Sequence, residues 1–169
     1  MIQRIYPRQT FNPYPRRLIE IPILNLVAAG DRDLPFADAD GREYATVWST
    51  EVNGPPELVR VCGHSMDDNG PRAIRDGELV LLNPTQLRPI LGGVYVIRLD
   101  GQNTYIKEYR RTRAGLVFYS LSPEQDLYPP IRHDARVEVL GAVYGRLQPD
   151  HTVELLPWWE HHLDTRQMN

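Results

Sequence analysis

Residues 93–110 read GVYVIRLDGQNTYIKEYR and carry the clearest structural signal in the chain. Two runs rich in β-branched and aromatic residues flank Asp100-Gly101, and an Asp-Gly pair between such runs is a strong short-range indicator of a β-hairpin. A two-residue turn would set Val94 opposite Lys107. Because side chains alternate along a strand, Lys107 would then share one mainly apolar face with Val94 and Tyr105. The stretch predicts two antiparallel strands and a lysine that has lost much of its contact with water.

Similar runs recur from about residue 44 onward, separated by Gly, Pro, Asn or Asp. The predicted strands are Tyr44–Thr50, Glu57–Cys62, Glu78–Leu82, Gly93–Leu99, Thr104–Arg110, Leu116–Leu121, Val137–Leu147 and Thr152–Leu156. Hardly any helix is readable in the sequence, and we find no internal repeat. The pattern predicts a mostly-β fold in three parts: an irregular arm and loop over residues 1–43, a β-domain over 44–148 and a tail over 149–169.

The composition fits one ordinary globular domain. The chain has 169 residues, of which 41% are hydrophobic and 24% charged, and its net charge is −3. A mildly acidic chain lacks the overall positive field of a nonspecific nucleic-acid binder. A single cysteine, Cys62, excludes an internal disulfide framework and a multi-cysteine zinc site, and fits a reducing compartment such as the cytoplasm. The longest apolar stretch, residues 21–29, is too short to span a bilayer and lies behind three prolines, which disfavours a secretory signal.

Three polar segments outside the predicted strands each allow two interpretations. Residues 1–18 contain four arginines and no acidic residue, so they could contact nucleic acid or an acidic partner, or form a solvated terminus. The aspartates of residues 30–43 could suggest calcium, but the EF-hand spacing is absent, which favours a solvated loop. His161-His162 beside Glu160 could hint at a metal, although no further ligand spacing supports it, and Trp158-Trp159 are expected to pack on the domain or a partner. We therefore expect no metal and no cofactor.

Three short motifs could carry chemistry. Gly63-His64-Ser65-Met66 follows a predicted strand, where a serine on a tight turn can present its hydroxyl beside backbone N–H groups, although such a sequence is commonly just a turn. Burial of Lys107 would lower its pKa from about 10.4 toward neutrality, as a general base requires, whereas an isolated strand lysine commonly extends into solvent. Val27-Ala28-Ala29-Gly30 places small residues in an extended segment before a loop, which suits either a protease cleft or a simple linker.

In this combination and order, the motifs resemble the LexA-type Ser–Lys self-cleaving proteins, a family that includes LexA, phage repressors and the UmuD polymerase accessory proteins. The matching segments are residues 21–30 with Ala29-Gly30, residues 59–66 with Ser65, residues 74–80 with the Asp76-Gly77 turn, residues 104–109 with Lys107, and residues 139–145. The resemblance covers about residues 20–147. Each motif alone is common, and the specificity lies in the combination.

The resemblance implies a β-clip domain of the LexA and signal-peptidase type. It implies that Ser65 is the nucleophile, that a neutral Lys107 takes its proton, and that the substrate is the Ala29–Gly30 peptide bond. The backbone N–H groups of His64 and Ser65 would form the oxyanion hole. The His64 side chain itself is expected to be a bystander, because adjacent residues on a strand or turn tend to point apart.

The resemblance also implies partners and a setting. The protein would be a cytoplasmic homodimer that cleaves itself in the SOS response to DNA damage, with a RecA filament as the trigger. The product would act on an error-prone polymerase or a repressor, without a membrane, a metal or a cofactor.

Two departures from the family pattern leave an alternative open. Only about 20 residues, none of them helical in pattern, precede the cleavage motif, so we expect no helix-turn-helix and no sequence-specific DNA binding, as in UmuD. Residues 67–73 look like an insertion beside the predicted active site. The alternative is a non-catalytic β-domain that acts as an antirepressor or regulatory partner of a LexA-type or phage repressor.

Overall fold

The structure, a computed structural model, describes residues 16–29, 43–52 and 57–167. Its elements are β1 (Leu18–Ala29), β2 (Tyr44–Trp48), a short 3-10 turn (Ser49–Glu51), β3 (Glu57–Gly63), β4 (Leu79–Asn83), β5 (Val94–Leu99), β6 (Asn103–Thr112), β7 (Gly115–Tyr119), β8 (Ile131–Arg132), β9 (Val137–Leu147), β10 (Val153–Leu155) and α1 (Pro157–Gln167). The mostly-β prediction is confirmed.

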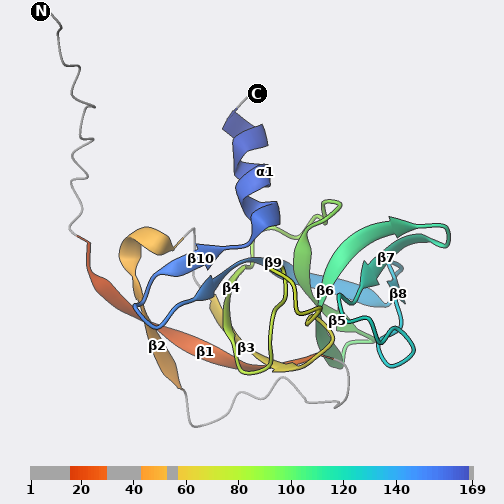
Figure 1. The fold of residues 1–169 in the computed structure, drawn as a ribbon, viewed down its shortest axis with the longest axis horizontal. Helices are drawn as coiled ribbons and strands as arrows, with labels where there is room; N and C mark the ends of the chain where they lie inside the picture. Colours follow the sequence, from red (N-terminus) through yellow and green to blue (C-terminus); the bar gives the residue numbers. More distant parts are fainter. Residues whose placement is uncertain (1–15, 30–42, 53–56, 168–169) are drawn as a thin grey trace, which may run out of the picture.

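The strands form one sheet that curls back on itself (Figure 1). Their order is β2-β1-β3-β4-β9-β5-β6-β7-β8, and β10 pairs with β9. Among the described strands only β1 and β3 pair in parallel, and the other pairs are antiparallel. β1 also contacts β6, although β6 lies four strands beyond β3 in the sheet order. The curl therefore brings the first and the later strands together.

β1 begins well before residue 44, where the sequence led us to expect the start of the β-domain. Ile21 and Ile23 of this strand are buried in the apolar core. The first part of β1 pairs with β2 and the remainder with β3. Pro22 lies where the strand changes partner, a position at which its missing N–H removes no regular ladder bond. The segment that leads to Ala29 is thus a core strand and not an irregular arm.

The β5–β6 hairpin is confirmed, but the observed pairing of β5 with β6 is shifted by one residue from the predicted pairing. Leu99 pairs with Asn103, which leaves three residues in a turn where the sequence predicted two. The additional residue shifts the second strand relative to the first, as in a bulged hairpin. Lys107 therefore lies opposite Tyr95 instead of Val94. It keeps the aromatic neighbours of its own strand, so the predicted apolar surroundings remain.

Alternation along the central strands sends side chains to two buried clusters. β5 contributes Val94 and Val96 to one cluster and Tyr95 to the other. Both faces of the sheet are therefore lined by apolar side chains over this region. Met66 lies in the first cluster, so the turn that carries Ser65 is anchored in the core.

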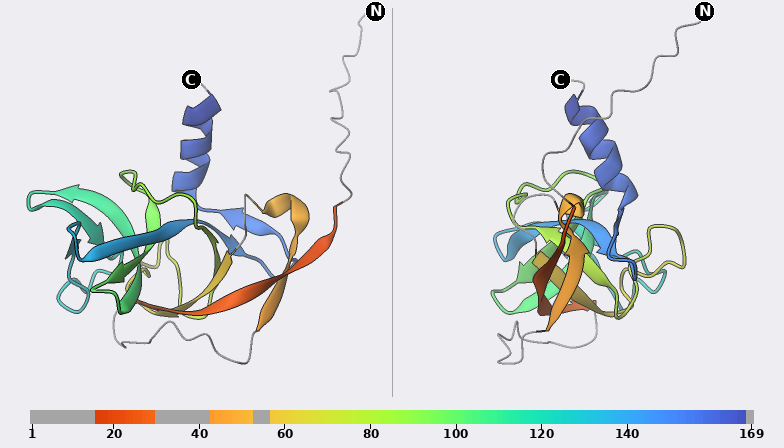
Figure 2. Two further views of the ribbon diagram at one scale, coloured as in Figure 1. Left: turned by 180° about the vertical axis from the view of Figure 1, so that it is seen from behind. Right: turned by 90° about the vertical axis from the view of Figure 1, so that its left-hand side faces the viewer.

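The chain after β9 folds back on the domain through β10 and then forms α1, a helix that the sequence analysis missed. The Trp159 side chain is buried, with its ring centroid 5.5 Å from that of Tyr144. The indole N–H of Trp158 donates to the carbonyl oxygen of Val143 at 3.0 Å. Packing of both tryptophans on the domain is thereby confirmed, while the later turns of α1 project away from the sheet (Figure 2). No helix in the described part of the chain is long and apolar enough to cross a membrane.

Candidate active site

Ser65 lies on a tight turn at the end of β3. Gly63 ends the strand with a φ of 94°, a conformation that residues with a side chain rarely adopt. The N–H of Asp67 donates to the carbonyl oxygen of His64 at 3.1 Å and closes the turn. Ser65 is buried while the His64 side chain is exposed. The two neighbours are thus in different environments, as the bystander interpretation of His64 requires.

Several backbone contacts hold this turn in place. The Gly63 N–H donates to the Asp76 carboxylate at 2.7 Å, and the Gly77 N–H donates to the carbonyl oxygen of Val61 at 2.9 Å. The Asp76-Gly77 turn of the family motif therefore supports the end of β3. On the other side, the N–H of Ser122 donates to the carbonyl oxygen of Ser65 at 2.9 Å. The serine is consequently fixed from two segments that are distant in sequence.

The Lys107 amine reaches Ser65 from β6. Its Nζ lies 2.8 Å from the Ser65 Oγ, within hydrogen-bond distance. Only 2% of the lysine is exposed, and burial lowers its pKa to about 7. The rings of Tyr105 and Tyr128 lie on its flanks, with centroids 5.7 and 5.8 Å from Nζ. An amine in these surroundings loses its proton far more readily than an exposed lysine, and in its neutral form it can accept a proton from a neighbouring hydroxyl.

A second serine, which the sequence analysis missed, also contacts the lysine. The Ser120 Oγ lies 2.6 Å from Lys107 Nζ, and the side chain is fully buried just after β7. The sequence analysis placed Ser120 inside the predicted strand Leu116–Leu121, where a single serine carries no spacing that would mark it as a site residue. Its contact with Lys107 depends on the register between β6 and β7, which the sequence pattern alone does not fix.

The segment with the predicted cleavage site lies beside this turn. Ala28 of β1 pairs with Cys62 of β3, and Ala29 pairs with Gly63, two residues before Ser65. β1 also contacts β6, the strand that carries Lys107. Gly30, the other half of the predicted scissile bond, lies outside the described residues. The described end of β1 thus reaches the neighbourhood of both side chains.

Donors for an oxyanion are present on the same turn. The backbone N–H groups of His64 and Ser65 lie on this turn, directly after Gly63, which pairs with Ala29 of β1. Preorganised N–H groups without an acceptor can stabilise the negative oxygen of a tetrahedral intermediate. The predicted oxyanion hole is compatible with this arrangement.

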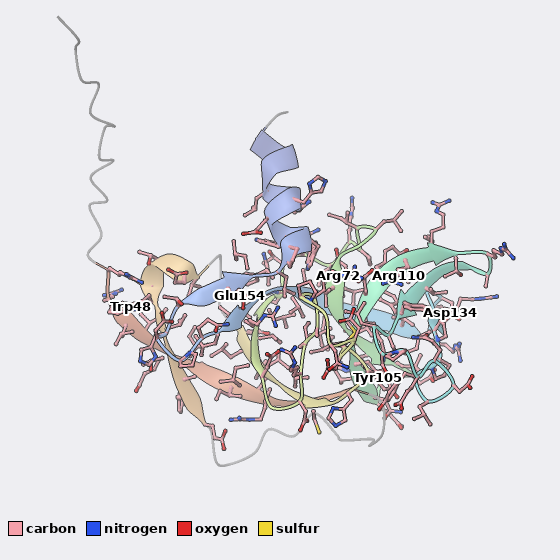
Figure 3. All side chains as sticks on the ribbon, viewed as in Figure 1. Trp48, Arg72, Tyr105, Arg110, Asp134 and Glu154 are labelled. Atoms are coloured by element: carbon pink, nitrogen blue, oxygen red, sulfur yellow. The ribbon has the colours of Figure 1, made fainter. Side chains whose placement is uncertain are left out.

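Glu108, the neighbour of Lys107 along β6, is buried but neutralised by two arginines. Its carboxylate lies 3.3 Å from an Nη of Arg72 and 2.6 Å from the Nε of Arg110. In Figure 3 the labels of Arg72 and Arg110 stand next to each other over the later strands, and the label of Tyr105 stands lower in the view. Because residues 107 and 108 point to opposite faces of the strand, the pair leaves the lysine pocket without an ionised carboxylate. No group of three or more His, Cys, Asp or Glu side chains among the described residues could hold a metal ion.

Residues 22–144 match the Peptidase S24-like family. The chain belongs to this family. A LexA repressor of Carboxydothermus hydrogenoformans is 28% identical over 134 residues, which cover 79% of this chain and 62% of that protein. The chain thus spans less than two thirds of the length of this relative. The predicted resemblance to the LexA-type proteins is confirmed at the level of the S24 family and its β-clip fold.

Proposed function

We propose that this S24-family protein is a self-cleaving serine peptidase in which Ser65 is the nucleophile and Lys107 the general base. The 2.8 Å contact between Ser65 Oγ and Lys107 Nζ in a buried site is the observation that carries the proposal. Arginine could not replace the lysine, because a guanidinium stays protonated at any pH at which a protein is folded.

The proposed reaction proceeds in two steps. The neutral Lys107 amine takes the Ser65 hydroxyl proton as the oxygen attacks the carbonyl carbon of Ala29, and the developing oxyanion is bound by N–H groups of the turn. The C–N bond to Gly30 then breaks, and the Lys107 ammonium returns its proton to the departing amine. Water, deprotonated in turn by Lys107, hydrolyses the ester between Ser65 and Ala29 and restores the free serine.

The substrate is part of the same chain. The parallel pairing of β1 with β3 carries Ala29 to the level of Gly63, so the scissile bond needs no diffusional encounter. Fixing the reacting groups in one molecule supplies a large effective concentration, which makes a deep specificity pocket unnecessary.

We propose further that the cleavage belongs to a cytoplasmic DNA-damage response, with a RecA filament as the trigger. The similarity to a LexA repressor supports this setting. In this proposal the cleaved protein is a homodimer, and it acts on an error-prone polymerase or a repressor.

A cleavage assay with matched variants tests the catalytic assignment. The purified protein should break into two pieces at alkaline pH, at a first-order rate that does not depend on protein concentration. Ser65→Ala and Lys107→Arg should each reduce the rate at least about 1,000-fold. His64→Ala should cleave at the wild-type rate. Activated RecA should accelerate cleavage at neutral pH.

Other results would favour the alternative function. Equal cleavage by the wild type and Ser65→Ala would remove the assignment of the nucleophile. An intact wild-type chain that forms mixed dimers with a LexA-type repressor would indicate a regulatory β-domain instead.

A further inference from the structure

We propose that Ser120 is a third, positioning residue of the peptidase site, which holds the Lys107 amine so that its lone pair is directed at Ser65. This inference rests on the proposed function and extends it beyond a two-residue mechanism. Ser120 itself does not touch the scissile bond in this account and acts only through the lysine.

The geometry gives Lys107 two oxygen neighbours at hydrogen-bond distance. Nζ lies 2.6 Å from the Ser120 Oγ and 2.8 Å from the Ser65 Oγ, and both serines are fully buried. A neutral amine has two N–H donors and one lone pair. If one N–H donates to Ser120, rotation about the terminal C–N bond is restricted, and the lone pair can accept the Ser65 proton.

The remaining surroundings of the amine are aromatic. The rings of Tyr105 from β6 and Tyr128 from the segment before β8 flank Nζ, and Tyr95 lies opposite Lys107 on β5. Among the residues described around Nζ, the two serines supply its hydrogen-bonding oxygens. Loss of either oxygen therefore changes a large fraction of the polar contacts of the amine.

The segment that carries Ser120 also holds the nucleophile. The Ser122 N–H donates to the Ser65 carbonyl oxygen at 2.9 Å, and the Gln125 side-chain amide donates to the Ser120 carbonyl oxygen at 3.1 Å. One short segment thus fixes the backbone of the nucleophile and the side chain of the base relative to each other. A rigid support of this kind is what a preorganised site needs.

The test compares Ser120→Ala with Thr104→Val. Thr104 is an equally buried hydroxyl on β6 whose Oγ1 has no hydrogen-bond partner in the described structure, so its removal controls for the loss of a buried hydroxyl. Lys107 is the only lysine in the sequence, so protein labelled with ¹³C-lysine gives a single side-chain signal whose pH titration reports this residue directly.

In Ser120→Ala, the pKa of Lys107 should fall by about 0.5 to 1 unit below the wild-type value, because a hydrogen bond to an ammonium is stronger than one to an amine. The alkaline plateau of the self-cleavage rate should fall at least about tenfold, because the neutral amine is no longer held in position. Thr104→Val should keep the wild-type titration and plateau.

A wild-type titration and plateau in Ser120→Ala would overturn the inference. A lower plateau without a shift in the lysine titration would also overturn it, as would an equal loss in Thr104→Val. Failure of the wild type to cleave would reject the proposed function, and with it a positioning role. The titration would then still report whether Ser120 and Lys107 are bonded.

Discussion

At the scale of single residues, the sequence contains one lysine, and this lysine is the proposed general base. Lys107 is the only lysine among 19 residues of Lys and Arg type. Arginine serves the ion pairs of this molecule, such as those of Glu108, because it remains charged and can be only a donor. Lysine can lose its proton when it is buried, and the buried position of Lys107 lowers its pKa to about 7.

The lowered pKa should appear in the pH dependence of stability. The unfolded chain binds a proton on Lys107 up to pH about 10.5, whereas the folded chain releases it near 7, so stability rises with pH between these values. In a Ser65→Ala background, which prevents cleavage, Lys107→Met should remove this contribution. The free energy of unfolding of the lysine protein should increase by about 2 kcal/mol relative to the Met variant between pH 7 and 9.

Urea denaturation at several pH values measures this difference. Parallel stability curves for the two proteins would show that Lys107 keeps an ordinary pKa, and would remove the physical basis for its role as a base.

Some residues of the candidate site could be predicted from the sequence, and others could not. Ser65 and Lys107 were accessible because their motifs and order form a specific combination. The apolar surroundings of Lys107 were predicted correctly from alternation along its own strand, even though its partner on β5 is Tyr95 and not Val94. Ser120 could not be found, because no local pattern relates it to Lys107.

At the scale of elements, the main omissions were β1 and α1. β1 contains Pro22 and lies before a polar loop, which made it look like a linker, but Pro22 sits where the strand changes partner and costs no ladder bond. α1 begins with Pro157, a residue that favours the first helical position, and this was the signal for it that the sequence offered.

The predicted insertion over residues 67–73 contacts the domain through Arg72, which pairs with Glu108, and through Arg146 of β9. The Arg146 guanidinium donates to the carbonyl oxygens of Ala73 at 2.9 Å and Pro71 at 3.1 Å, and its Nε lies 3.2 Å from the Glu154 carboxylate. The side chain is largely buried. Removal of the guanidinium would leave two carbonyl oxygens without this donor.

Arg146→Met should therefore lower the free energy of unfolding by about 2 kcal/mol. Arg136→Met is the matched control, because Arg136 forms an ion pair with Asp134 that is exposed to solvent and should change stability by no measurable amount. Chemical denaturation of both variants checks the prediction. Equal stability of Arg146→Met and the wild type would mean that the insertion is held by other contacts.

At the scale of the whole molecule, the curl of the sheet makes the candidate site. Ser65 follows β3, Lys107 lies in β6 and Ser120 follows β7, so only a sheet that closes on itself can bring them together. The resemblance to the LexA-type proteins predicted this architecture, whereas strand periodicity alone predicted only that the chain is mostly β. We predicted the parallel pairing of β1 with β3 neither from the resemblance nor from strand periodicity.

Because β1 is a core strand, the cleaved protein should not fall apart. After cleavage at Ala29–Gly30, the piece 1–29 would still contribute Ile21 and Ile23 to the core and pair with β2 and β3. The two pieces should elute together in size-exclusion chromatography under native conditions and separate in denaturant. Separation without denaturant would show that β1 contributes little to the stability of the sheet.

The masses of the cleavage products show whether Ser65 and Lys107 cut the chain after Ala29. Purified protein is incubated at alkaline pH, denatured and analysed by mass spectrometry. We expect two products, with the masses of residues 1–29 and 30–169, and an intact Ser65→Ala control. An uncleaved wild-type chain, or a break at any other bond, would contradict this expectation.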